Sequence, residues 1–192
     1  MEAALDRIQF KYSLTDRQRK LLQFSFIGII YDSTKFLMLF IFFACIEQIP
    51  AYIFCSLLLI LLRSNQGGLH LKHYTSCFVF SFFYLFSAIA IFPDIFTDIP
   101  QSVGLIILFI CLLINYSAGP QKNKKIYSYL KNPSAVKKSK LNSFIICILY
   151  MLTYFIFSDI PLFQQGFWII VLHTIQIVFV ILRTKRKEKK NG

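Results

Sequence analysis

A cysteine and two histidines occur together in the stretch NQGGLHLKHYTSC, residues 65–77. A cysteine thiolate attacks carbonyl carbons, and a neighbouring imidazole favours the thiolate and later gives a proton to the leaving group. Cys77 is therefore a candidate nucleophile for peptide-bond cleavage or acyl transfer. His73 precedes it by four residues and His70 by seven, so either imidazole is a candidate general base and acid.

The backbone between the histidines and the cysteine decides which imidazole reaches the sulfur. In one continuous helix His73 would lie beside Cys77, whereas about 10 Å of helical rise would separate His70 from it. Gly67 and Gly68 predict that the preceding helix ends before the histidines. A bend in this segment would allow His70 to fold back onto Cys77.

A second helix is expected to begin beside the cysteine. Thr75 or Ser76 is a suitable N-cap, because the apolar run begins at Phe78. Cys77 would then lie in the first helical turn, where backbone N–H groups and the helix dipole favour the thiolate. The Cys77 N–H and the Gln66 amide are candidate donors to an oxyanion. From these residues alone, two interpretations stay open: a catalytic cysteine–histidine pair, or a chance occurrence of both residues in one segment.

The elements around this segment have the composition of a membrane protein. Of 192 residues, 56% are hydrophobic, 17% aromatic and only 16% charged, whereas soluble domains are about a quarter charged. The sequence predicts an all-α polytopic fold with about six transmembrane helices in a single integral membrane domain, residues 1–192. The apolar stretches fall at 24–46, 51–62, 78–92, 102–116, 143–157 and 163–182.

The N-terminal arm, residues 1–20, is charged and amphipathic, without the apolar core and cleavage site of a signal peptide. Two interpretations stay open for it: a solvated cap helix, or an interfacial helix on anionic headgroups.

Charge is distributed unevenly over the connections. The turns EQIP, TDIP and SDIP each carry an acid and a proline but no Lys or Arg. The basic residues gather in the arm, the 63–77 segment, the 117–141 loop and the tail, residues 183–192. The positive-inside rule then predicts that both termini and the 63–77 segment are cytoplasmic, in a compartment that keeps thiols reduced. This topology explains the net charge of +12 without nucleic-acid binding.

The remaining polar residues leave two other classes of function open. The other four cysteines lie in apolar runs, and their spacing fits neither a zinc site nor a disulfide framework, so no metal or cofactor is expected. A small transporter or channel would need polar residues along a path. Asn115, His173 and Gln176 are the candidates, but hydrogen bonding between helices is the favoured interpretation of the last two. A non-catalytic scaffold is the third class.

The motif Arg63…Gly67-Gly68-Leu69-His70, followed by Cys77, resembles that of the accessory gene regulator B family. These are membrane cysteine endopeptidases of quorum sensing in Gram-positive bacteria. The size, the six apolar segments and the lysine-rich loop are also similar. The resemblance implies that Cys77 is the nucleophile and His70 its general base and acid. It further implies that Arg63 and the two glycines support activity, and it demotes His73 to a surface residue. An alternative role for Arg63, compatible with the first, is to close a membrane span on the cytoplasmic side.

The resemblance also implies a substrate and a location. The substrate would be a short propeptide with an amphipathic N-terminal helix and an acidic C-terminal tail. Cleavage would leave the signal segment as a thioester on Cys77, which the propeptide's own thiol or hydroxyl closes into a ring. The protein would lie in the bacterial cell membrane, and a homodimer is a further expectation. Basic side chains of the loop could hold the acidic tail, or could only set topology and meet anionic lipid: Lys122, Lys124, Lys125, Lys131, Lys137, Lys138 and Lys140.

Overall fold

The computed structural model describes residues 15–68, 74–97, 99–120 and 133–191, and the chain divides into two compact units, residues 1–47 and 48–192. Among the described residues, six helices are long and apolar enough to cross a membrane, and no strand occurs. The predicted all-α, multi-pass membrane architecture is therefore confirmed.

The described part of the first unit is one long helix, α2 (Asp16–Cys45). A capping box starts it: Thr15 accepts a hydrogen bond from the Gln18 backbone N–H, and the Gln18 side chain accepts one from the Thr15 N–H. Within the apolar part of α2, Lys35 forms an ion pair with Asp32 at 2.7 Å. The predicted amphipathic arm lies mostly outside the described residues.

The second unit contains the other five spans. They are α3 (Ile49–Gln66), the broken helix α4 (Tyr74–Phe86), η1 (Ser87–Ile91) and α5 (Phe92–Ile95), then α6 (Gln101–Ala118), α8 (Pro133–Phe157) and α9 (Pro161–Asn191). The fifth apolar stretch, 143–157, lies within a longer helix, because α8 begins at Pro133. Its first turns are polar and basic, so hydropathy alone does not reveal them.

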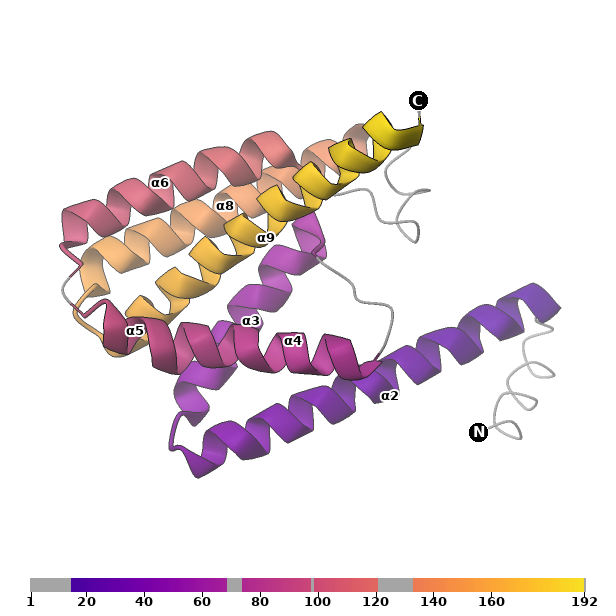
Figure 1. Cartoon of the computed structure of the whole chain (residues 1–192), viewed down its shortest axis with the longest axis horizontal. Coiled ribbons are helices and arrows are strands. Elements are labelled where there is room, and N and C mark those ends of the chain that lie inside the picture. Colours follow the sequence, from indigo (N-terminus) through magenta and orange to yellow (C-terminus); the bar gives the residue numbers. More distant parts are fainter. Residues whose placement is uncertain (1–14, 69–73, 98, 121–132, 192) are drawn as a thin grey trace. The chain divides into compact units, whose positions relative to one another are not determined.

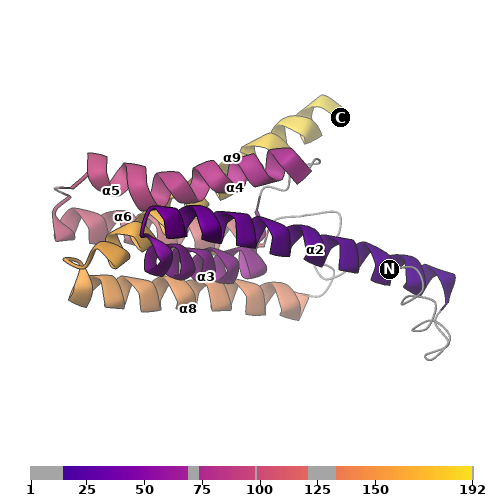
Figure 2. The same cartoon turned by 90° about the horizontal axis from the view of Figure 1, so that it is seen from below.

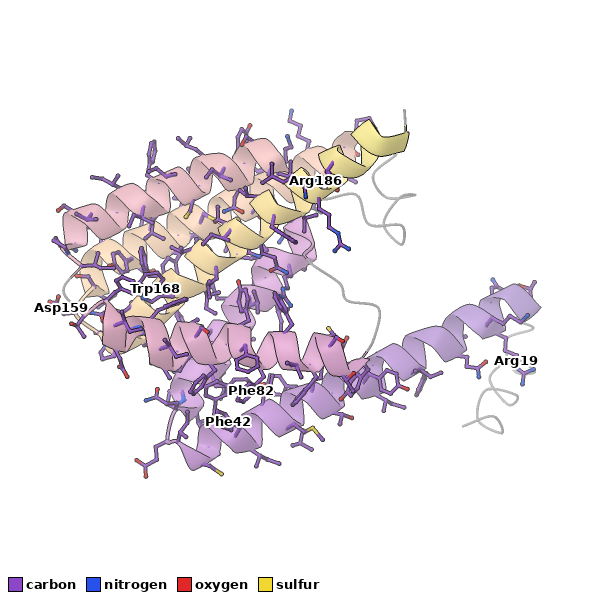
Figure 3. The ribbon with its side chains drawn as sticks, in the orientation of Figure 1. Arg19, Phe42, Phe82, Asp159, Trp168 and Arg186 are labelled. Atoms are coloured by element: carbon purple, nitrogen blue, oxygen red, sulfur yellow. The ribbon has the colours of Figure 1, made fainter. Side chains whose placement is uncertain are left out.

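The two ends of this unit differ in chemistry. At one end, here called the turn end, short connections join α5 to α6 and α8 to α9 (Figure 1). Pro50 lies in the first turn of α3 and Pro161 begins α9, as expected for proline at a helix start. The opposite end, the loop end, includes Gln66, Tyr74, Ala118 and Pro133. Figure 3 shows Asp159 and Trp168 at the turn end and Arg186 at the loop end.

Helix α9 is the centre of the packing. It contacts α3, α5, α6, η1 and α8, and α6 also packs along α8 (Figures 1 and 2). Glycines allow close approach, as is common between membrane helices. A Cβ on Gly104 of α6 would lie 2.6 Å from the Tyr154 hydroxyl of α8, and one on Gly166 would lie 2.7 Å from the ring of Phe54.

The break in the third span has a local cause. Pro93 has no N–H, so the carbonyl of Ile89, four residues earlier, loses its helical partner. The Gln165 side chain of α9 donates to this carbonyl at 3.1 Å, and to Gln48 Oε1 at 3.2 Å. The π-helical turn η1 lies next to the proline. Gln165 therefore satisfies a backbone group that the proline would otherwise leave unpaired within the apolar span.

Candidate functional site

The end of α3 places the first part of the candidate catalytic segment. Gly67 has a φ of 79°, a conformation that side chains disfavour, and its N–H bonds to the Arg63 carbonyl at 2.8 Å. The prediction that the glycine pair ends this helix is confirmed. His70 and His73 lie outside the described residues, so the choice between them stays a prediction.

Cys77 lies half-buried in the first turn of α4, as expected. The prediction of an N-cap at Thr75 or Ser76 was wrong, because α4 begins at Tyr74 and both residues are already helical. Their hydroxyls are compatible with the first helical turn as well as with the cap. The cysteine keeps its place near the positive end of the helix dipole.

The side chain of Arg63, on α3, lies against the face of α4 that carries Cys77. Its guanidinium lies 5.4 Å from the centre of the Tyr84 ring, within the range of a cation–π contact. Tyr84 follows Cys77 by seven residues, two helical turns along one face. Arg63 is also close enough to Cys77 for the two groups to interact electrostatically. The structure thus brings together two of the residues that the sequence motif singled out.

Gln66, at the C-terminal end of α3, is completely buried and joins three helices. Its Nε2 donates to the Asn115 carbonyl of α6 at 2.8 Å, and its Oε1 accepts from His173 Nε2 of α9 at 3.2 Å. Because an amide oxygen only accepts, this bond places the His173 proton on Nε2. Both polar ends of Gln66 therefore have structural partners, and its role as an oxyanion donor stays a prediction.

The polar residues that could have lined a transport path instead connect helices. Asn115 Nδ2 donates to Thr174 Oγ1 at 2.7 Å and to the Cys111 carbonyl at 2.8 Å. Together with the His173–Gln66 bond, these contacts tie α3, α6 and α9 at the loop end. The interpretation of His173 and Gln176 as partners in interhelical hydrogen bonds is confirmed.

Gln176 holds the side chain of Arg63 from across the bundle. Arg63 Nη2 donates to Gln176 Oε1 at 3.4 Å, although 113 residues separate them. The Arg63 Nε and the Gln176 Nε2 are both buried and have no hydrogen-bond partner among the described residues. The sequence does not reveal that Gln176 lies near residues 63–77, since only the folded α3–α9 contact brings them together.

The N-terminal part of α8, which carries the last lysines assigned to the basic loop, contacts the same end of α3. The Ser139 hydroxyl of α8 donates to the Asn65 carbonyl, one residue before Gln66. On either side of Ser139, Lys138 is exposed and Lys140 is half-buried, and Lys137 is also exposed. The other lysines assigned to this loop, Lys122, Lys124, Lys125 and Lys131, lie outside the described residues. The described lysines thus lie on a segment that contacts the C-terminal end of α3.

A pocket of about 160 Å³ lies at the turn end, around Asp159 and Trp168 (Figure 3). None of its described lining residues comes from residues 63–77. This pocket is therefore separate from the cysteine site.

Comparison with known proteins supports the motif. Residues 2–178 match the family described as Accessory gene regulator B. A protein of Clostridium beijerinckii with an AgrB-like name is 27% identical over 166 residues, which cover 82% of this chain and 80% of the relative. No solved structure matches the chain. The spans, the Arg–Gly-Gly–Cys arrangement and the family match over nearly the whole chain agree: this multi-pass membrane protein belongs to the accessory gene regulator B family of quorum-sensing accessory proteins.

Proposed function

We propose that the protein is a membrane cysteine endopeptidase that removes the C-terminal tail of a signal propeptide and closes the remaining signal segment into a ring. The observation that carries the proposal is the position of Cys77, half-buried in the first turn of α4 and within electrostatic range of Arg63. Reactive cysteines are commonly found at helix N-termini and beside basic side chains. The four other cysteines lie in apolar spans without an arginine described beside them.

The reaction proceeds in two acyl transfers. His70 takes the proton of Cys77, whose sulfur attacks the carbonyl carbon after the signal segment. The C–N bond breaks, His70 gives the proton to the departing amine, and the signal segment stays as a thioester on Cys77. A thiol or hydroxyl of the signal segment then attacks this thioester. His70 takes its proton and returns it to the Cys77 sulfur as the ring closes.

The ring-closing step is close to balanced in energy when the attacking group is a thiol, since one thioester replaces another. Water competes with the attacking group, so the acyl-enzyme must be shielded. A half-buried cysteine at the end of a membrane span, with Arg63 of α3 nearby, suits this requirement.

The loop end faces the cytoplasm in this proposal, because the basic connections and the tail gather there and the turns at the other end are acidic. Lys137 and Lys138 are exposed beside the Ser139–Asn65 contact, so they are placed to attract an acidic propeptide tail toward the end of α3. The lysines and the basic tail would also meet anionic lipid. A homodimer remains part of the proposal through family resemblance alone.

The direct test is cleavage of the propeptide by variants in membranes of stated lipid composition. Cys77→Ala and His70→Ala are expected to abolish release of the tail peptide, detected by mass spectrometry, whereas His73→Ala is expected to retain it. Cys45→Ala, outside the site, controls for removal of a thiol. Cleavage by Cys77→Ala would contradict the proposal, and loss of activity in His73→Ala alone would reassign the base.

A further inference from the structure

We propose that Arg63 Nε and Gln176 Nε2 form an acceptor subsite beside Gly68 that binds a backbone carbonyl oxygen of the propeptide next to the scissile bond. This inference rests on the proposed function, and it adds Gln176, on the last helix, to the groups that touch the substrate.

The two donors are among the buried polar atoms that have no hydrogen-bond partner in the described part of the chain. Buried polar groups nearly always have hydrogen-bond partners, and an unpaired one costs about 1–3 kcal/mol. The Gln176 side chain is only 6% exposed, yet its Nε2 has no partner among the described residues. The same holds for Arg63 Nε. Two such donors side by side indicate a place for an acceptor that arrives with the substrate.

The two donors are held in position by the bond between their own side chains. Arg63 Nη2 donates to Gln176 Oε1 at 3.4 Å, which turns the amide nitrogen of Gln176 away from that contact. The Tyr84 ring supports the guanidinium from α4, and its hydroxyl donates to the Ile169 carbonyl of α9 at 3.3 Å. A preorganised pair of donors binds an acceptor without first paying the entropy of ordering two long side chains.

Gly68 provides the space that such an acceptor needs. The point where a Cβ of Gly68 would stand lies 3.4 Å from Arg63 Nε and 3.5 Å from Gln176 Nε2. Because Gly68 has no side chain, the side of its backbone that faces both donors is left free for an acceptor atom of the substrate. A methyl group at the same point would cover them.

The chemistry of the pair selects a backbone carbonyl. A carbonyl oxygen has two lone pairs in one plane and can accept from two donors at once. Arg63 also interacts electrostatically with Cys77, which places the subsite in the neighbourhood of the reacting sulfur. A peptide that runs past Gly68 toward Cys77 would bring its main-chain carbonyls to these donors in turn.

The test compares three variants of the full-length protein in membranes. Gln176→Leu removes both polar atoms. Gln176→Glu keeps an oxygen for Arg63 but replaces the donor by an acceptor. Gln165→Leu is the matched control, because Gln165 is an amide on the same helix with the same 6% exposure, and both its partners lie at the turn end. Rates are measured per folded protein, with steady-state cleavage of the propeptide and alkylation of Cys77 by iodoacetamide.

We expect kcat/KM to fall roughly tenfold to a hundredfold in both Gln176 variants. Gln165→Leu should keep the wild-type value, and the alkylation rate of Cys77 should not change in Gln165→Leu or in the uncharged variant Gln176→Leu. Full activity of Gln176→Glu would overturn the inference, since the amide would then only hold Arg63. Slower alkylation in Gln176→Leu would also overturn it, in favour of a positioning role. These outcomes differ from failure of the proposed function, in which Cys77→Ala itself would still cleave.

Discussion

Replacing Gly68 by Ala tests whether the substrate binds beside this residue. The added methyl group should block the subsite without disturbing the fold. The added methyl group would meet Arg63 Nε at 3.4 Å and Gln176 Nε2 at 3.5 Å, which is ordinary van der Waals contact. The φ of Gly68 lies outside the left-handed region, so alanine is not strained there. Alanine also lowers the entropy of the unfolded chain, so we expect stability to be unchanged or to rise by about 0.4–1 kcal/mol.

Activity should fall although the fold is intact. The methyl group displaces an acceptor from two donors, of which the Arg63 bond is charge-assisted and contributes about 1.5–3 kcal/mol, and the amide bond about 0.5–1.5 kcal/mol. The sum of about 2–4.5 kcal/mol corresponds to a loss of kcat/KM of roughly 30-fold to 2,000-fold. The assay is propeptide cleavage by purified Gly68→Ala in membranes, with thermal unfolding measured on the same samples.

Gly67→Ala is the contrasting variant. Its φ of 79° means that alanine is strained by about 1–3 kcal/mol, so it should lower thermal stability first. If Gly68→Ala cleaves at the wild-type rate while it folds normally, the space beside Gly68 does not bind the substrate and the reasoning fails. A large loss of stability in Gly68→Ala would show that the local packing has been misjudged.

Three further changes test other parts of the structure. Gln66→Leu and His173→Leu should each lower the unfolding temperature, and the double variant should cost about 0.5–2 kcal/mol less than the sum, because the two share a buried hydrogen bond; strictly additive costs would contradict this bond. Replacing Lys137 and Lys138 by Gln should weaken binding of an acidic-tailed propeptide, measured by fluorescence titration, and the difference from the wild type should disappear at high salt. If the variant binds as tightly as the wild type at low salt, the two lysines have only a topological role. Gly104→Ala should destabilise the α6–α8 contact, since its Cβ would lie 2.6 Å from a tyrosine hydroxyl; an unchanged unfolding temperature would show that α8 moves aside freely.

The sequence predicted which segments form helices better than it predicted the residue at which each helix begins. Long apolar runs separated by proline-containing turns identified the spans, because a bilayer requires that length of apolar helix. The start of α8 at Pro133 was missed, since a helix that leaves the membrane continues in polar residues with no change in hydropathy to mark it. The N-cap beside Cys77 was misplaced for the same reason: hydroxyl residues suit both the cap and the first turn.

The local part of the candidate site was also readable. Gly67 marked the end of α3, and Cys77 was expected in the first turn of the following helix. The residues of α9 that contact the motif could not be predicted. The periodicity of apolar residues indicates which face of a helix is buried, but not which other helix packs against that face. Gln176 and Arg63 are neighbours only in the folded bundle, and so are Ser139 and Asn65.

Trapping the acyl-enzyme tests the central claim most directly. Propeptide whose ring-closing residue is replaced by alanine is mixed with the protein in membranes, and the intact mass of the protein is measured before and after hydroxylamine. We expect an added mass equal to the signal segment, located on Cys77, lost with hydroxylamine and absent from Cys77→Ala. Tail release without any adduct, or an adduct that persists in Cys77→Ala, would contradict it.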